Sequence, residues 1–196
     1  MNIALFDFDG TITEKDTYTP FIHFSVPKWR RIVCTILLLP VIVLYKCKLI
    51  GGSTTRSIVS FFAFCGRNKK AVYTQGKDYA QTLDQLVMTQ ANKRLQWHRA
   101  QGDIIVIVSA SLDTYLTPWC DKHQFQLICA TLNTKGQRLT GTYKNGDCSG
   151  AEKARRVSAE FNLDSFDTVY AYGDTDEDKQ LLALADVGFL NWQQIQ

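Results

Sequence analysis

The chain has 196 residues, of which 45% are hydrophobic and 21% are charged, and its net charge is +3. This balance excludes an intrinsically disordered chain and fits one compact domain with a sizeable insertion. The small net charge alone points to no class of partner.

The first predicted element is a short strand. Residues 2–6 form an apolar run that ends abruptly in Asp7-Phe8-Asp9-Gly10. Such a run before an acidic, glycine-containing segment is typical of a buried strand followed by a tight loop. The two aspartates also interrupt any apolar leader, so the N-terminus is not expected to be a signal peptide.

Residues 17–99 form the next region and are predicted to be helical, without a convincing strand. Charge separates this part from the rest of the chain. Between Glu14 and Arg94 there are 13 Lys/Arg and 4 Asp/Glu, which leaves 9 basic and 15 acidic residues elsewhere. An acidic part suits a cation site, and a basic part suits an anionic substrate or surface.

The apolar run 32–45 is the most unusual segment of this helical region. It is interrupted only by Thr35 and has basic residues on both sides. It is shorter than the roughly 20 residues of a spanning helix, and Pro40 would kink it. Two interpretations stay open: a buried core helix, or a helix in a membrane interface whose flanking charges meet anionic lipid. The basic surroundings favour the second, and the lack of a polar face speaks against it.

Strands and helices alternate in the remainder of the chain. Apolar runs predict strands at residues 104–108, 127–131, 168–172 and 187–190. Helical stretches are predicted at residues 112–123, 151–161 and 176–185, and a small β excursion at residues 138–144. This alternation indicates an α/β fold with a parallel sheet, and the helical region is inserted after the first strand.

Polar residues follow three of the predicted strands. In an open parallel sheet, sites form at the carboxyl ends of the strands, near a topological switch point. Asp7 and Asp9 end the first strand, and Ser109 ends the second. Asp174 follows the fourth strand, and Lys153 lies at the start of the helix before it. One edge of the sheet is therefore expected to gather carboxylates, a hydroxyl and an ammonium group.

These residue types predict phosphoryl chemistry with a hard metal ion. Three carboxylates without His or Cys nearby form an oxygen-only site, which suits Mg²⁺. A carboxylate such as Asp7 can attack phosphorus, and Asp9 can protonate the leaving oxygen and later deprotonate water. Ser109 and Lys153 can stabilise charge on the phosphoryl oxygens.

Four motifs, in this order, resemble those of the haloacid dehalogenase (HAD) superfamily. The segment from Asp7 to Thr13 resembles its DxDGT signature, Ser109 its second motif, Lys153 its third, and residues 173–178 its fourth, GDxxxD. The long insertion resembles the C1-capped subfamily that includes phosphoserine phosphatases. With its apolar run, the insertion more closely resembles a bacterial subset of this subfamily that includes phosphatidylglycerophosphate phosphatases.

The resemblance implies a Rossmann-like parallel sheet core of residues 1–16 and 100–196 with an inserted helical C1 cap of residues 17–99. Asp7 would be the nucleophile and a metal ligand, and Asp9 the acid/base with its backbone carbonyl on Mg²⁺. Ser109 and Lys153 would hold the phosphoryl group.

Four further positions complete the implied site. Asp174 and Asp178 would finish the metal site, Asp178 through a water. Asp16 and Arg56 are the cap residues expected to bind substrate. Asp16 could instead cap a helix, and Arg56 could be a surface charge.

We therefore predict a Mg²⁺-dependent phosphomonoester hydrolase that works through an aspartyl-phosphate intermediate. Its substrate would be a small, phosphoserine-like metabolite or a lipid headgroup phosphate, and no nucleic-acid partner is expected. Six cysteines without CxxC or zinc spacing favour a reduced, cytoplasmic protein. Peripheral contact with the anionic inner face of the membrane is part of this hypothesis.

Two alternatives use the same residues differently. A receiver-type signalling domain also forms an aspartyl-phosphate, but its phosphorylated Asp follows a later strand, where this chain has Ser109. The other alternative is a catalytically silent membrane-binding module on a phosphatase scaffold, against which the intact motif residues speak. Turnover of p-nitrophenyl phosphate separates an enzyme from both.

Overall fold

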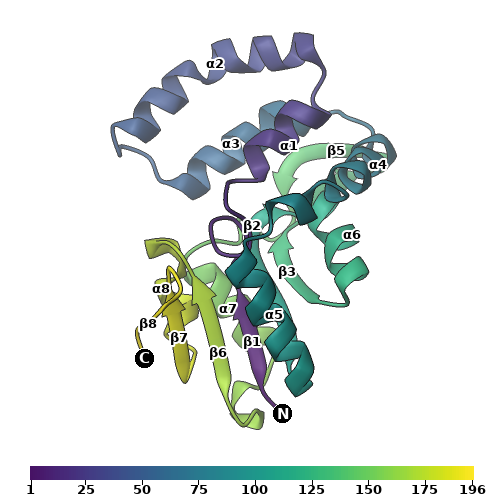
Figure 1. Cartoon of the computed structure of the whole chain (residues 1–196). Coiled ribbons are helices and arrows are strands. Elements are labelled where there is room, and N and C mark those ends of the chain that lie inside the picture. Colours follow the sequence, from purple (N-terminus) through teal and green to yellow (C-terminus); the bar gives the residue numbers. More distant parts are fainter.

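A six-stranded, mostly parallel sheet forms the centre of the computed structural model, which describes residues 1–196 (Figure 1). The strands follow the order β3-β2-β1-β6-β7-β8. Their bounds are β1 Ile3–Phe6, β2 Ile104–Leu112, β3 Gln126–Ala130, β6 Val169–Gly173, β7 Val187–Leu190 and β8 Gln193–Gln194. All neighbours pair in parallel except β7 and β8. The predicted α/β fold with a parallel sheet is confirmed.

The register of the central strands determines where the site lies. Phe6 at the end of β1 is level with Ile107 of β2 and Tyr172 of β6. Asp7, Ser109 near the end of β2 and the residues that follow β6 therefore lie at the same edge of the sheet. The chain runs outward from β1 to β3 and then returns to place β6 beside β1. The switch point lies between these two strands, where ligands bind in open α/β sheets.

Four helices cover the sheet: α5 (Thr89–Gln101), α6 (Asp113–His123), α7 (Ala151–Glu160) and α8 (Lys179–Leu182). Short 3₁₀ turns η2 (Leu163–Ser165) and η3 (Asp176–Asp178) complete the core. The predicted helix at 176–185 is thus a 3₁₀ turn followed by a single helical turn. The reason is local, because the Asp178 side chain accepts hydrogen bonds from the amides of Asp174 and Thr175 and tightens the backbone there.

The inserted region is helical, as predicted. It contains α1 (Tyr18–Ser25), α2 (Lys28–Lys46), α3 (Gly52–Phe64), α4 (Lys69–Ala80) and the 3₁₀ turn η1 (Leu83–Leu86). Figure 1 shows α1, α2 and α3 above the carboxyl edge of the sheet, with α2 outermost. The predicted β excursion is a hairpin of β4 (Leu132–Lys135) and β5 (Arg138–Tyr143), and β5 packs on α3.

The inner part of the insertion is continuous with the core of the sheet. One apolar cluster of 39 buried residues runs from β1 and β2 into the helices above them. Phe21 of α1 and Tyr79 of α4 both pack against Tyr115 of α6. Helix α5 packs on the sheet itself, where His98 hydrogen-bonds the Tyr172 hydroxyl at 2.9 Å. Most of helix α5 falls within the predicted cap of residues 17–99, and this boundary stays a prediction.

Helix α2 is the exception to this close packing. Among its 19 residues only Leu38 is buried, and its main neighbour is α3. The helix continues through Pro40, and Figure 1 shows it bent rather than broken. Of its two predicted locations, the buried core helix is wrong. No helix of the structure combines the length and hydropathy needed to cross a membrane.

Candidate active site

A buried cluster of carboxylates surrounds one lysine at the carboxyl edge of β1 and β6. Oxygens of Asp7, Asp174 and Asp178 all lie within 4.8 Å of one another. Lys153, on the buried face of α7, donates hydrogen bonds to Asp7 Oδ1 and to Asp178 Oδ1, the latter at 2.6 Å. The Lys153 side chain is only 4% exposed, so its charge depends on these two partners.

Glycines allow the loops of the cluster to approach closely. Gly10 has φ +84°, and a Cβ atom there would lie 2.1 Å from Asp174 Oδ2. At Gly173 a Cβ atom would lie 2.5 Å from the Cβ of Asp178. A side chain at either position would push the carboxylates apart. The glycines of the DxDGT and GDxxxD segments therefore shape the site without taking part in its chemistry.

The uncompensated negative charge of the ionised cluster favours the binding of another cation. Burial raises the pKa of Asp7 to about 7, although the Lys153 charge opposes the rise. Burial, with the charge of Asp178, raises the pKa of Asp174 to about 6. Burial costs the ionised carboxylates their hydration, and one ammonium offsets only part of that cost.

The donor set fits Mg²⁺. Asp7, Asp174 and Asp178 offer only hard carboxylate oxygens, and no His or Cys belongs to the group. Three carboxylates beside one ammonium leave two negative charges when all are ionised, which a divalent ion would balance. The Asp9 side chain is not part of this group. Its predicted contribution through the backbone carbonyl stays a prediction.

Asp9 lies outside the carboxylate group, where its side chain is hydrogen-bonded to Thr17 and Ser111. Its Oδ1 accepts from the Thr17 amide at 2.7 Å and from the Thr17 hydroxyl at 2.6 Å. Its Oδ2 accepts from the Ser111 hydroxyl. Burial raises the pKa of Asp9, and these donors oppose the rise. A carboxyl group that holds a proton more tightly than usual suits an acid/base role.

Ser109 lies at the same edge and is 1% exposed. Its Oγ accepts a hydrogen bond from the Ser111 amide at 3.1 Å. The hydroxyl proton stays free to be donated to another acceptor. Together with Lys153, Ser109 lines the cavity in which Asp7 lies.

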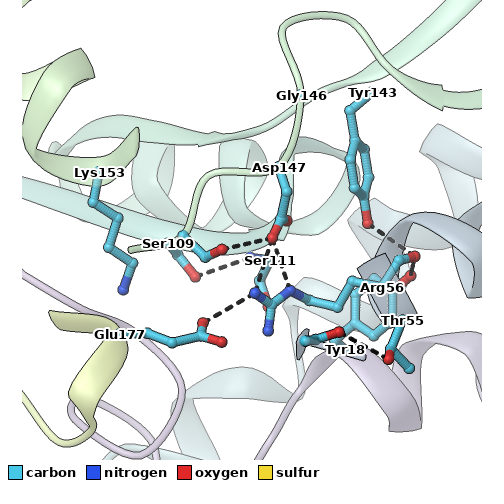
Figure 2. Close-up of polar contacts among 12 residues, drawn as sticks. Tyr18, Thr55, Arg56, Ser109, Ser111, Tyr143, Gly146, Asp147, Lys153 and Glu177 are labelled. Carbon is cyan, nitrogen blue, oxygen red and sulfur yellow. Dashed lines mark hydrogen bonds and ion pairs between the residues drawn. The ribbon is translucent and has the colours of Figure 1, made fainter. Parts of the chain in front are cut away.

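Arg56 of α3 connects the cap to the core (Figure 2). Its guanidinium lies 2.8 Å from Asp147 Oδ2 and 2.9 Å from Glu177 Oε2. Tyr143 donates a hydrogen bond to its backbone carbonyl. The alternative of a free surface charge is therefore wrong for Arg56. The residue also lines the cavity, and its predicted substrate contact stays a prediction.

Asp16 hydrogen-bonds the start of helix α1, in agreement with the alternative interpretation that it caps a helix. It is exposed, and its Oδ1 accepts a hydrogen bond from the Tyr18 amide at 2.9 Å. A bond of this kind satisfies a free amide in the first turn of α1. Asp16 lies on the cavity wall as well, so a contact with substrate stays a prediction.

A cavity of about 700 Å³ connects the carboxylate cluster to the cap. Its polar end contains Asp7, Ser109, Lys153 and Asp174. Its other end is formed by apolar side chains of α1, α2, α3 and the turn between α1 and α2, namely Ile22, Val26, Leu38, Ile42, Val59 and Ala63. A ligand in this cavity would meet charge at one end and hydrocarbon at the other.

The structure brings the predicted core residues together, and it adds contacts that the motifs did not indicate. Asp7, Asp9, Ser109, Lys153 and Asp174 all line the one cavity, and Asp178 lies behind Lys153. The additions are Thr17, Ser111, Asp147 and Glu177. Ser111 gave no signal in the sequence, because the predicted strand ends at residue 108 whereas β2 continues to Leu112 with an irregular register after Ser109.

Comparison with known proteins agrees with this geometry. The chain matches the haloacid dehalogenase-like hydrolase family over residues 4–183. It is 29% identical over 188 residues to Protein CicA of Caulobacter vibrioides (strain NA1000 / CB15N), an alignment covering 94% of this chain and 83% of that protein.

Solved structures share the fold at low sequence identity. A protein of unknown function from Bordetella pertussis Tohama I has a TM-score of 0.75 at 17% identity, over 96% of this chain and 89% of that one. A probable phosphoserine phosphatase from Vibrio cholerae has a TM-score of 0.68 at 14% identity, over 95% of this chain and 55% of that one. These similarities concern the fold.

Proposed function

The chain belongs to the haloacid dehalogenase-like hydrolase family, and from this premise we propose that it is a Mg²⁺-dependent phosphatase that uses Asp7 as its nucleophile. The observation that carries the proposal is the buried group of Asp7, Asp174 and Asp178 around Lys153, at the polar end of a cavity. The family and the fold favour an enzyme over the receiver-type alternative. They agree with the phosphatase predicted from the motifs.

The phosphoryl group would bind between Asp7 and the two donors that line the same cavity. Lys153 offers three N–H groups, two of which are used by Asp7 and Asp178. The Ser109 hydroxyl has a free proton to donate. Both groups are buried, so their hydrogen bonds to a charged oxygen would be stronger than in water.

In the first step an Asp7 carboxylate oxygen forms a bond to phosphorus, and the bond from phosphorus to the leaving oxygen breaks. Asp9 gives its proton to that oxygen. In the second step a water oxygen bonds to phosphorus, Asp9 takes the water proton, and the bond to Asp7 breaks. Inorganic phosphate leaves, and both aspartates return to their first state.

Asp7, Asp174 and Asp178 would hold the metal ion, directly or through water. When bound, Mg²⁺ would balance the two excess negative charges of the cluster and polarise the phosphoryl oxygens. Asp9 stays outside this group and is positioned by Thr17 and Ser111. Its burial raises its pKa, which favours the protonated form that the leaving oxygen needs.

The shape of the cavity favours a lipid phosphate over a phosphoserine-like metabolite. Ile22, Ile42 and Val59 are the partly exposed members of the apolar wall. An amino acid headgroup would leave these side chains in contact with water, whereas an acyl chain would cover them. Arg56 and Asp16 lie on the same cavity wall and are the proposed contacts for polar parts of the headgroup.

The test is a substrate panel assayed with Mg²⁺ and with EDTA. p-Nitrophenyl phosphate, phosphoserine and dioctanoyl phosphatidic acid below its micelle concentration would be compared by kcat/KM. We expect hydrolysis only with Mg²⁺ and the highest value for the lipid phosphate. Val59→Ser, which alters only the apolar wall, should raise KM for the lipid and not for phosphoserine. A folded protein that hydrolyses none of the three would refute the proposal.

A further inference from the structure

The outer side of α2 is an exposed apolar surface. Eight apolar residues of this helix are between 47% and 67% exposed, and two of them are Leu39 and Tyr45. The other six are Trp29, Ile32, Val33, Ile36, Leu37 and Val43, which we call the outer face of α2. Large apolar side chains this close together are unusual on a protein surface unless they bind something.

The inner side of α2 explains why this helix has no polar face. Leu38 is 6% exposed, and the Cys34 thiol donates to the Phe62 carbonyl of α3 at 3.4 Å. Ile42 lines the cavity. The inner side is therefore apolar because it packs within the chain. An interfacial helix usually turns a polar side to water, and here the cap occupies that side.

Charge around the outer face has one sign. No Asp or Glu occurs between Asp16 and Asp78, whereas this stretch holds ten Lys/Arg. Lys28 lies at the start of α2, and Lys46 and Lys48 lie at its end, all exposed. None of the three forms an ion pair with a carboxylate of the chain. The apolar surface is thus flanked by cations that are free to meet anions.

We propose that the outer face of α2 docks on an anionic phospholipid bilayer. Its apolar side chains enter the membrane interface, and the flanking lysines contact the lipid headgroups. Trp29 also lies in the interface, where an indole ring with an apolar body and a polar N–H is favoured. A second copy of the chain fits less well, because two such faces would bring clusters of like charge together. The inference does not depend on catalysis, since it concerns a surface outside the carboxylate cluster.

Vesicle co-sedimentation tests the proposal with the full chain. Phosphatidylcholine vesicles with and without 30% phosphatidylglycerol would be compared, and binding is expected only to the anionic ones. Ile32→Ser/Ile36→Ser/Val43→Ser and, separately, Lys46→Gln/Lys48→Gln should each lower the partition coefficient by about tenfold or more. Ile195→Ser and Lys179→Gln, which replace exposed residues of the same kinds on the core, should leave it unchanged.

Tryptophan fluorescence locates the contact. Anionic vesicles should shift the emission to the blue in the wild-type chain, and Trp29→Phe should remove most of that shift. Unchanged turnover of p-nitrophenyl phosphate, or an unchanged circular dichroism spectrum if the chain is inactive, shows that each variant is folded. Equal binding of the triple variant and the wild type overturns the proposal. So does a concentration-dependent dimer that the triple variant abolishes while vesicles bind neither protein.

Discussion

The carboxyl edge of the sheet and the outer face of α2 are opposite exceptions to the usual distribution of side chains, because the first buries charged groups and the second exposes apolar ones. At the sheet edge, charged groups are buried, and Lys153 has two carboxylate partners. On α2, apolar side chains such as Ile36 are 62% exposed and have no partner in the chain. The first arrangement concentrates charge away from water, which is typical of catalytic sites. The second leaves hydrocarbon in water, which is typical of binding surfaces.

The contrast also shows how each region depends on what is outside the chain. Burial raises the pKa of Asp7 to about 7 and that of Asp174 to about 6, so the cluster depends on a proton or a cation for its charge balance. The outer face of α2 is incomplete without an apolar surface. Substitutions at the sheet edge should therefore change the chemistry strongly, while those on the outer face of α2 should leave chemistry and stability nearly unchanged.

The largest effect is expected for Asp7→Asn. The amide keeps the shape of the side chain but cannot attack phosphorus, so kcat should fall by on the order of 10⁴-fold or more. Steady-state hydrolysis of p-nitrophenyl phosphate measures the loss. Asp176→Asn, at a side chain that is 87% exposed, is the matched control and should keep full activity. Substantial turnover by Asp7→Asn would rule out the assignment of Asp7 as the nucleophile.

Lys153→Met should come next. The loss of a buried donor to the phosphoryl oxygens is expected to lower kcat by roughly 10²–10³-fold. The unfolding free energy should also fall by on the order of 3 kcal/mol, because Asp7 and Asp178 would share a buried site without an ammonium group. Chemical denaturation measures the stability.

Arg155→Met is the control for the lysine variant, since it removes a cation from the exposed side of the same helix. It should change neither kcat nor stability. If both variants behave alike, the buried position of Lys153 has no special role.

Ser111→Ala tests the position of Asp9 rather than the chemistry itself. Removal of one donor to Asp9 Oδ2 should lower kcat/KM by about tenfold, the usual effect of a hydrogen bond to a charged group. That bond also lowers the pKa of Asp9, so the pH profile of kcat/KM should move to higher pH. Ser158→Ala, on the exposed side of α7, should do neither. A lower rate with an unmoved profile would indicate only a structural role.

Stability of the metal-free protein should decline as the pH rises. The raised pKa values of Asp7, about 7, and Asp174, about 6, mean that the folded chain holds protons which the unfolded chain releases above pH 4. Rising pH through the window from about 4 to 7 therefore lowers the unfolding free energy. A loss on the order of 2 kcal/mol would reduce Tm by roughly 4–8 °C in a chain of this size.

Mg²⁺ should oppose this decline because it binds the ionised carboxylates. The rise in Tm between EDTA and Mg²⁺ is therefore expected to be larger at pH 8 than at pH 5. Thermal melts at both pH values measure it, and Asp7→Asn should flatten the dependence in EDTA. A larger effect of Mg²⁺ at pH 5 would contradict the assignment of the metal site.

The sequence predicted what depends on local pattern, and it missed what depends on distant contacts. Asp7, Ser109 and Asp174 were found because each follows an apolar strand, and parallel strands end at one edge. The bond from Ser111 to Asp9 joins residues 102 positions apart, and that from Arg56 to Asp147 spans 91. The pattern of apolar and polar residues along the sequence does not reveal contacts between residues so far apart.

Helix α2 shows a second limit of pattern reading. Its two sides are both apolar, so hydrophobic periodicity could not show which side faces the cap. The position of α3 determines which side of α2 faces the cap. Arg30 donates to the carbonyl of Phe62 at 2.8 Å and to that of Cys65 at 2.7 Å, which turns Leu38 inward and leaves Ile36 outside.

The smallest effect is therefore expected on the outer face of α2, and it is the sharpest test of the contrast. Leu38→Ala removes a buried side chain and should lower the unfolding free energy by about 2 kcal/mol or more. Ile36→Ser, two residues away on the same helix, replaces a side chain that is already in water and should change it by less than about 0.5 kcal/mol. Urea denaturation of both variants gives the comparison. If Ile36→Ser is as destabilising as Leu38→Ala, this face is covered by protein in solution, and a bilayer is not needed to explain its composition.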